Sequence, residues 1–205
     1  IGLTDTIDVD VYAQYEWDHL QIDGVGTYFS STDILGLGAQ EVYLGFGQTA
    51  DFGSADAASC TSCGFRLGDR DAEDSGQYGA KLSWYAEDLN ETEFGFYYVN
   101  YHNRRPIISG YAAGGFNPAY PQYALATKGF VEYLEDIELY GVSFNTTIQS
   151  SGTAVSGEIT VRQDEPLQID DVELLFATLE PVGRVPSGTS QIPAGTLPGG
   201  EISGY

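Results

Sequence analysis

Residues 6–18 alternate strictly between apolar and polar side chains. The apolar positions are Ile7, Val9, Val11, Ala13, Tyr15 and Trp17. A period of two over about a dozen residues predicts a β-strand longer than the usual five or six residues. The intervening positions are mostly acids, so this strand suits a wall with lipid on one side and water on the other. It suits the edge of a soluble sandwich as well.

Two hairpins are predicted further along the chain. Residues 77–86 and 93–102 flank the polar stretch 87–91, and residues 137–148 and 154–162 flank a Ser-Ser-Gly turn. Long irregular loops, 19–76 and 103–135, join the other strand ends, and only residues 41–46 within them suggest a short strand. Outer-membrane barrels combine short turns at one rim with long loops at the other. The pattern therefore predicts an all-β fold with long antiparallel strands of a partial outer-membrane-type β-barrel.

Residues 169–179 predict one short helix. Asp170 and Asp171 would cap it or complement its dipole. Its apolar stripe, where we expect any apolar cargo to pass, consists of Val172, Leu175, Phe176 and Leu179. The helix is too short to span a bilayer. It would pack over a barrel mouth, plug a lumen or cover a sheet edge as an ordinary surface helix.

Charge narrows the classes of partner. The 205 residues include 30 Asp and Glu against 8 Lys and Arg, a formal net charge of -22. Nucleic-acid binding is excluded as a general function because it needs clustered basic residues. Docking on anionic lipid through a basic face is disfavoured for the same reason. An acidic barrel interior would favour cations over anions.

Cys60 and Cys63 are the only cysteines. Their C-x-x-C spacing lacks the helix expected after a thioredoxin-like redox motif, and it lacks the second pair or histidine expected of a zinc site. We interpret the pair as a small structural disulfide, which indicates an oxidising compartment.

Two charged groups are candidate binding sites. Asp69, Asp71 and Asp74 offer hard oxygen ligands, so calcium is the one candidate cofactor, although metal-free acidic loops are common. Arg104 and Arg105 form the densest positive charge in the chain. They are candidates for contact with an anion, and the plain alternative is charge balance in an acidic protein.

Catalytic motifs are missing from the sequence. Neither His19 nor His102 lies in a triad or metalloprotease pattern, and there is no nucleophile elbow or P-loop. Carboxylate pairs of the glycosidase type would arise by chance among so many acids. We therefore expect no enzyme activity and no catalytic residue.

Several stretches carry a resemblance to a known family. They occur in family order at residues 15–17, 22–30, 91–110, 131–146, 165–175 and 200–205. The sequence resembles the large proteobacterial family called domain of unknown function thirteen-zero-two. The resemblance implies a β-barrel of the bacterial outer membrane, usually far longer than this chain. We therefore expect an internal segment, with further strands before Ile1 and after Tyr205.

The resemblance also implies a setting. It suggests contact with outer-membrane lipid, an RND-type exporter and an outer-membrane lipoprotein as partners, and passage of a hydrophobic or lipid-like molecule across the outer membrane. No catalytic residues come with it. The alternative is a secreted or surface structural β-protein that self-associates through open strand edges.

Overall fold

The computed structural model describes residues 1–29, 36–44, 63–192 and 197–205. Strands account for 41% of the chain and helix for 9%, so the predicted all-β class is confirmed. The chain forms two compact units. The long-strand unit comprises residues 1–18, 72–104 and 134–165, and the short-strand unit comprises residues 19–71, 105–133 and 166–205.

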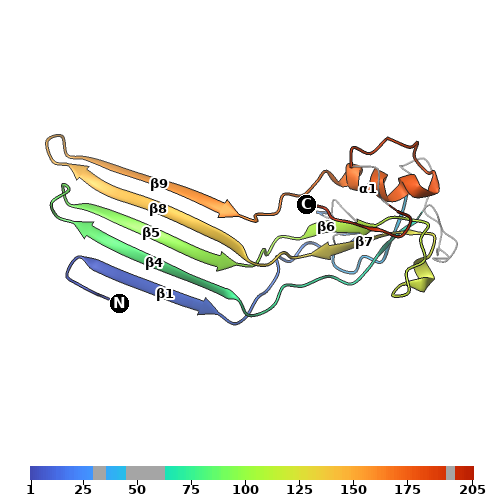
Figure 1. Cartoon of the computed structure of the whole chain (residues 1–205), viewed down its shortest axis with the longest axis horizontal. Helices are drawn as coiled ribbons and strands as arrows, with labels where there is room; N and C mark the ends of the chain where they lie inside the picture. Colours follow the sequence, from blue (N-terminus) through green and yellow to red (C-terminus); the bar gives the residue numbers. More distant parts are fainter. Residues whose placement is uncertain (30–35, 45–62, 193–196) are drawn as a thin grey trace. The chain divides into compact units, whose positions relative to one another are not determined.

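The long-strand unit is one open antiparallel sheet of five strands (Figure 1). In spatial order these are β1 (Ile7–Gln14), β4 (Gln77–Ala86), β5 (Thr92–Tyr101), β8 (Ile137–Ile148) and β9 (Thr153–Gln163). All five were predicted, β4 and β8 with the observed bounds. β1 ends at Gln14 rather than at residue 18 because its partner β4 begins opposite it, at Gln77.

The short-strand unit contains a second open sheet. Its spatial order is β10 (Glu201–Ile202), β6 (Ile107–Tyr111), β7 (Thr127–Glu132), β3 (Cys63–Arg66) and β2 (Glu41–Tyr43). β3 and β7 run parallel, and the other pairs are antiparallel. The prediction of irregular loops over residues 19–76 and 103–135 was therefore wrong for β3, β6 and β7, whereas β2 lies within the short strand suggested at residues 41–46. Every residue of β7 and all but one of β6 are buried, so neither strand alternates in polarity.

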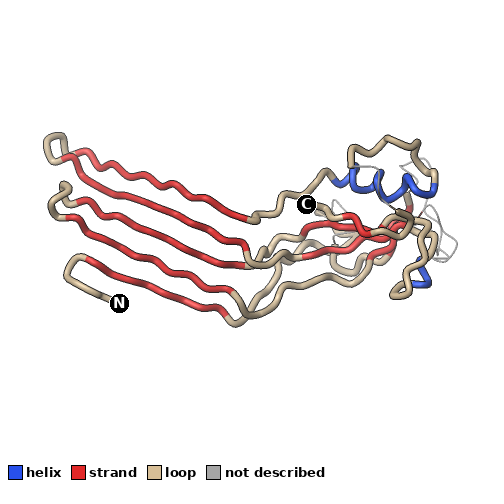
Figure 2. Tube along the Cα trace, in the orientation of Figure 1, coloured by secondary structure: helices blue, strands red, loops and turns tan. Residues whose placement is uncertain are grey.

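Three separate chain segments build the short-strand unit (Figure 2). The chain enters it after β1, after β5 and after β9, and these three strands all end away from the hairpin turns. β2 and β3 come from the first segment, β6 and β7 from the second, and α1 (Asp171–Leu179) and β10 from the third. Two 3-10 turns, Pro121–Tyr123 and Glu180–Val182, complete the described elements.

The helix α1 begins after an Asp cap. The Asp170 carboxylate accepts hydrogen bonds from the backbone N–H groups of Val172 and Glu173 at 3.0 and 3.3 Å. The helix thus starts two residues later than predicted. Its fully buried residues are Leu174, Ala177, Thr178 and Leu179.

Of the four residues in the predicted apolar stripe of this helix, only Leu179 is buried as predicted. Val172 is 48% exposed, and Leu175 and Phe176 are only half-buried. Small side chains face the sheet instead, because α1 lies close to β6: a Cβ on Gly110 would stand 3.3 Å from the Thr178 methyl group. The packed core beneath the helix consists of Ile108, Ala112, Leu174, Ala177 and Ile202.

Candidate functional site

Strand pairing in the long-strand unit places apolar side chains in rows across all five strands. The central row is Val9, Leu82, Phe96, Val142 and Ile159. The row toward the hairpin turns is Ile7, Trp84, Phe94, Phe144 and Gly157, and the opposite row is Val11, Ala80, Tyr98, Tyr140 and Val161. We call this side of the sheet the apolar face. Glu138 is the only charged strand residue on it.

The apolar face is uncovered by the described chain. Ile159 is 77% exposed, Val11 66% and Val142 48%. A shallow hollow of about 680 Å³ lies over its central rows. Soluble monomers rarely expose an apolar surface that is continuous over five strands, so this face is suited to an apolar medium or partner.

Aromatic rings flank the central row. Trp84 stacks on Phe94 with ring centroids 5.4 Å apart. On the other side of the row, Tyr98 lies between Tyr78 at 6.0 Å and Tyr140 at 5.1 Å. Rings at the borders of an apolar band are typical of membrane-facing sheets. Four residues separate the two aromatic rows, about 14 Å along a strand, so this band is narrower than the roughly 25 Å of a whole barrel belt.

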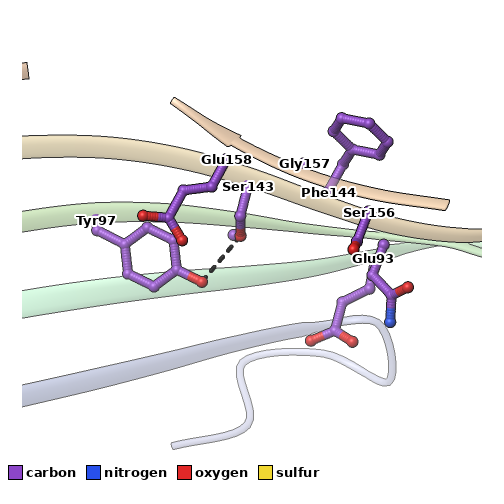
Figure 3. A pocket seen from close by; sticks show the side chains of 9 residues that line it. Glu93, Tyr97, Ser143, Phe144, Ser156, Gly157 and Glu158 are labelled. Atoms are coloured by element: carbon purple, nitrogen blue, oxygen red, sulfur yellow. Dashed lines mark hydrogen bonds between the residues drawn. The ribbon is translucent and has the colours of Figure 1, made fainter. Parts of the chain in front are cut away.

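The other side of the same sheet, which we call the polar face, carries the charges. Its charged strand residues are Asp8, Asp10, Lys81, Glu93, Glu158 and Arg162. A hollow of about 440 Å³ opens on it beside Tyr97 and Ser143, whose side-chain oxygens are 2.9 Å apart. Figure 3 shows these two side chains with Glu93 and Glu158 on one side of the strands and Phe144 on the other. This arrangement can bind water, cations or hydroxylated groups.

Glycines within the sheet are covered by aromatic neighbours. A Cβ on Gly95 would stand 2.6 Å from the Ser143 hydroxyl and would also collide with the Tyr97 hydroxyl. On the apolar face, a Cβ on Gly157 would stand 2.6 Å from the Phe144 ring. Such pairs fill the gap that a missing side chain leaves on a strand. Both faces are therefore continuous despite several glycines.

The short-strand unit holds the strongest ionic network of the described residues. Arg70 donates to both carboxylate oxygens of Glu201, at 2.6 and 3.1 Å, and to the Tyr111 hydroxyl at 2.8 Å. Its guanidinium also lies 4.0 Å from the centroid of the Phe130 ring. Arg70 lowers the pKa of Glu201 below its usual value by hydrogen bonding. Burial, followed by the hydrogen bond to Glu201, raises the pKa of Tyr111 to about 12.

The same network extends into the interior of this unit. Glu132 lies 3.6 Å from Arg70 and accepts a hydrogen bond from the buried Ser109 hydroxyl. The Ser109 oxygen in turn accepts the backbone N–H of Gly204 at 2.9 Å. Lys128 is 2% exposed and donates to the Tyr123 carbonyl at 3.3 Å, and burial lowers its pKa. The contacts of Arg70 and Tyr111 with Glu201, and of Ser109 with Gly204, fasten residues 201–205 to the sheet, which is a structural role.

The structure does not assemble the predicted calcium site. The described residues contain no group of three or more His, Cys, Asp or Glu side chains that could hold a metal ion. Asp69 instead pairs with Arg66 at 2.6 Å, and Asp74 accepts the Trp17 backbone N–H at 3.2 Å. Asp71 is exposed. Calcium binding by Asp69, Asp71 and Asp74 stays a prediction.

Other predicted site residues have less definite outcomes. Arg104 donates to the Asp18 carbonyl at 2.6 Å, and Arg105 is exposed, so their contact with an anion stays a prediction. Cys60 lies outside the described residues, and Cys63 is 1% exposed at the start of β3, so the Cys60–Cys63 pairing also stays a prediction. Among the described helices, none is long and apolar enough to cross a membrane.

Sequence reasoning missed Glu138 and the Arg70 network. The alternation of residues 137–148 could have revealed that Glu138 lies on the apolar face. It is the single charged residue at the alternate positions that also hold Tyr140, Val142 and Phe144. No sequence signal connects Arg70 with Tyr111, Glu132 and Glu201, since these partners are dispersed over the chain.

One family matches the chain. It is described as Protein of unknown function (DUF1302), and the match covers residues 1–205. No match was found among curated proteins or among solved structures. The family agrees with the resemblance drawn from the sequence, and its description names no activity.

Proposed function

The chain belongs to the DUF1302 family, and on this premise we propose that its long-strand sheet is part of a β-barrel wall in the bacterial outer membrane. The apolar face contacts lipid, and the polar face lines a hydrated interior. The observation that carries the proposal is the exposure of an apolar surface continuous over five paired strands.

Strand length and charge placement support this proposal. The five strands have 8, 10, 10, 12 and 11 residues, and crossing a bilayer takes about nine to eleven. Six of the seven charged strand residues lie on the polar face. A charge on the lipid face is costly near the bilayer centre, whereas one in a hydrated lumen is not.

We propose further that the barrel serves the passage of a hydrophobic or lipid-like molecule rather than catalysis. The support is the family resemblance, which implies an RND-type exporter and an outer-membrane lipoprotein as neighbours. Such a cargo could touch the predicted apolar stripe of α1 only where the stripe is accessible. Val172 is exposed, whereas Leu179 is fully buried.

Lipid contact can be tested with Trp84. The full natural protein is reconstituted in vesicles that contain phospholipids brominated on the acyl chains, and the Trp84→Phe variant isolates the contribution of Trp84 to the fluorescence. We expect Trp84 emission to be quenched and the protein to migrate differently on gels before and after heating. Unquenched emission, together with solubility without detergent, would overturn the proposal.

Passage is tested separately in cells. Loss of the natural gene should change the rate at which a fluorescent alkyl probe crosses the envelope, and the intact gene should restore it. If the crossing rate is the same with and without the gene, although the protein inserts correctly when the gene is present, the transport role is overturned. The proposal of a membrane wall would still stand.

A second candidate function follows from the edges of the long-strand sheet. Within the described chain β9 pairs only with β8, so one of its edges presents unpaired backbone groups. Such an edge can pair with another copy of the chain. A surface structural protein would then form assemblies that grow with concentration in buffer without lipid or detergent, whereas a membrane wall would precipitate.

A further inference from the structure

The single charge on the apolar face lies among tyrosines. Glu138 is in β8, and its carboxylate oxygens each accept one hydroxyl hydrogen bond, from Tyr98 and from Tyr140, both at 2.9 Å. Tyr78 lies on the far side of Tyr98, with ring centroids 6.0 Å apart. The four side chains come from three neighbouring strands, β4, β5 and β8. We call this group the tyrosine–glutamate cluster.

The cluster marks the edge of the apolar band. Tyr98 and Tyr140 belong to the last apolar row, and Glu138 lies in the next row, together with Tyr78, Asn100 and Gln163. The rest of this row is uncharged and ends with Ala13 on β1. Tyr78 is 46% exposed and Tyr140 43%, so ring surface in the cluster is accessible from outside.

The carboxylate keeps unused hydrogen-bonding capacity. An ionised Glu offers about four acceptor sites, and the two tyrosine hydroxyls occupy two of them. In the described part of the chain, no Lys or Arg nitrogen lies within 4.0 Å of Glu138. The carboxylate therefore has no cationic partner among the described residues of the chain.

A carboxylate among tyrosine rings has the chemistry of an ammonium site. Ring faces attract cations, and aromatic cages are a recurring means of binding ammonium groups. A primary ammonium fits better than a quaternary one, because it also has N–H donors for the free acceptor sites of Glu138. At the border of an apolar band, the abundant group of this type is the headgroup of phosphatidylethanolamine.

We propose that Tyr78, Tyr98, Tyr140 and Glu138 bind the primary ammonium of a phosphatidylethanolamine headgroup, with its acyl chains along the apolar face. This proposal rests on the proposed function, since it requires the apolar face to contact lipid. It adds a lipid preference that an ordinary aromatic border would not show.

The test is lipid retention measured by native mass spectrometry. The full natural protein is incubated with equal amounts of phosphatidylethanolamine, phosphatidylcholine and phosphatidylglycerol of the same acyl chains, and the lipids that stay bound are counted. We expect phosphatidylethanolamine to be retained about two- to fivefold over phosphatidylglycerol, the range that a cation–π contact at an exposed site provides. Glu138→Gln, which keeps the size and removes the charge, should abolish this preference.

Matched variants make the result specific. Asp8→Asn removes a carboxylate from the polar face of strand β1 and should leave the preference unchanged. Tyr140→Leu should weaken it, because an aliphatic side chain offers no ring face. Folding of each variant is checked by its heat-dependent gel migration.

The outcomes separate the two proposals. Quenching of Trp84 by brominated lipid with no preference for phosphatidylethanolamine would overturn the headgroup site and leave the membrane wall intact. A preference that persists in Glu138→Gln would also overturn the site. Equal retention of phosphatidylcholine would overturn the assignment to a primary ammonium. Absence of Trp84 quenching, together with solubility without detergent, would overturn the membrane wall, and the headgroup site with it.

Discussion

The described chain buries nineteen hydrophobic residues, and only three of them, Ala72, Ala86 and Ile137, belong to the long-strand unit. The other sixteen lie in the short-strand unit, between its sheet, its helix and its loops. In the long-strand unit, by contrast, rows of Val, Ile, Leu and aromatic side chains remain exposed. The short-strand unit therefore builds its own core, whereas the long-strand unit has an apolar surface that the described chain leaves exposed.

Under the proposed function, the hydrophobic effect acts through a different medium in each unit. Burial in a protein core stabilises by about 25 cal/mol for each Å² of apolar surface removed from water. A membrane removes the same surface from water without any packing partner in the chain. We expect the long-strand sheet to depend on lipid for stability and the short-strand unit to depend on internal contacts. Four predictions test this contrast, beginning with the largest effect.

The largest effect is expected on the apolar face. Ile159→Arg should destabilise the membrane-inserted protein by about 2–4 kcal/mol, the cost of a charge near the bilayer midplane. Its neighbour Thr160 points to the polar face, so Thr160→Arg should cost less than about 0.5 kcal/mol. Urea unfolding in vesicles, followed by gel mobility, measures both. Equal costs would mean that the two faces are in similar media.

Glycine substitutions distinguish the packing of the two units. In the short-strand unit, a Cβ on Gly115 would collide with backbone atoms of Pro198 and Gly199, which cannot move independently. Gly115→Ala should cost about 1–3 kcal/mol through overpacking. Gly95→Ala should cost less, because its neighbours are the movable side chains of Tyr97 and Ser143. Hydrogen exchange in each unit measures the cost of its substitution. A larger cost for Gly95→Ala than for Gly115→Ala would contradict the difference in packing between the two units.

The Arg70 network should make the short-strand unit sensitive to acid. Glu201→Gln should cost about 1–2 kcal/mol near neutral pH, less than for a buried pair because both side chains are nearly half exposed. The folded-state pKa of Glu201 lies below its ordinary value, so its contribution is present above the ordinary value and is lost as the pH falls through the folded-state value. Hydrogen exchange of β6 and β10 should therefore differ between parent and variant at pH 7. A difference that persists in strong acid would argue against an ionic origin.

The smallest effect is expected at the start of α1. Asp170→Ala removes the cap and should cost about 1 kcal/mol, whereas Asp170→Ser should retain most of the stability because Ser also accepts from the backbone. Hydrogen exchange at the first turn of α1 and over β6 checks both variants. The long-strand sheet should be unaffected, and a change there would show that the units are coupled.

Alternation determined much of the long-strand unit in advance. The five strands, both hairpin turns and the apolar phase of β1 were predicted, because a period of two places every second residue on one face whatever lies beyond it. Long strands repeat this signal over many residues, so the bounds of β4, β5, β8 and β9 were accurate to within one residue, whereas β1 ends four residues earlier than predicted. The sequence of residues 93–102 has aromatic residues on both sides, so it did not show which side belongs to the apolar face. Strand pairing decided this, because Phe94 and Phe96 align with Phe144 and Val142.

Tertiary structure alone decided the rest. β3, β6 and β7 are short and almost wholly buried, so no alternation marked them, and β3 and β7 meet although more than fifty residues of chain lie between them. The phase of α1 followed from the close approach of Thr178 to Gly110, which favours small residues at the contact over large apolar ones. The tyrosine–glutamate cluster likewise needed strand register, because Tyr78, Tyr98 and Glu138 meet only once β4, β5 and β8 are aligned. A sequence records which side chains alternate, whereas contacts between distant segments depend on how the folded backbone brings them together.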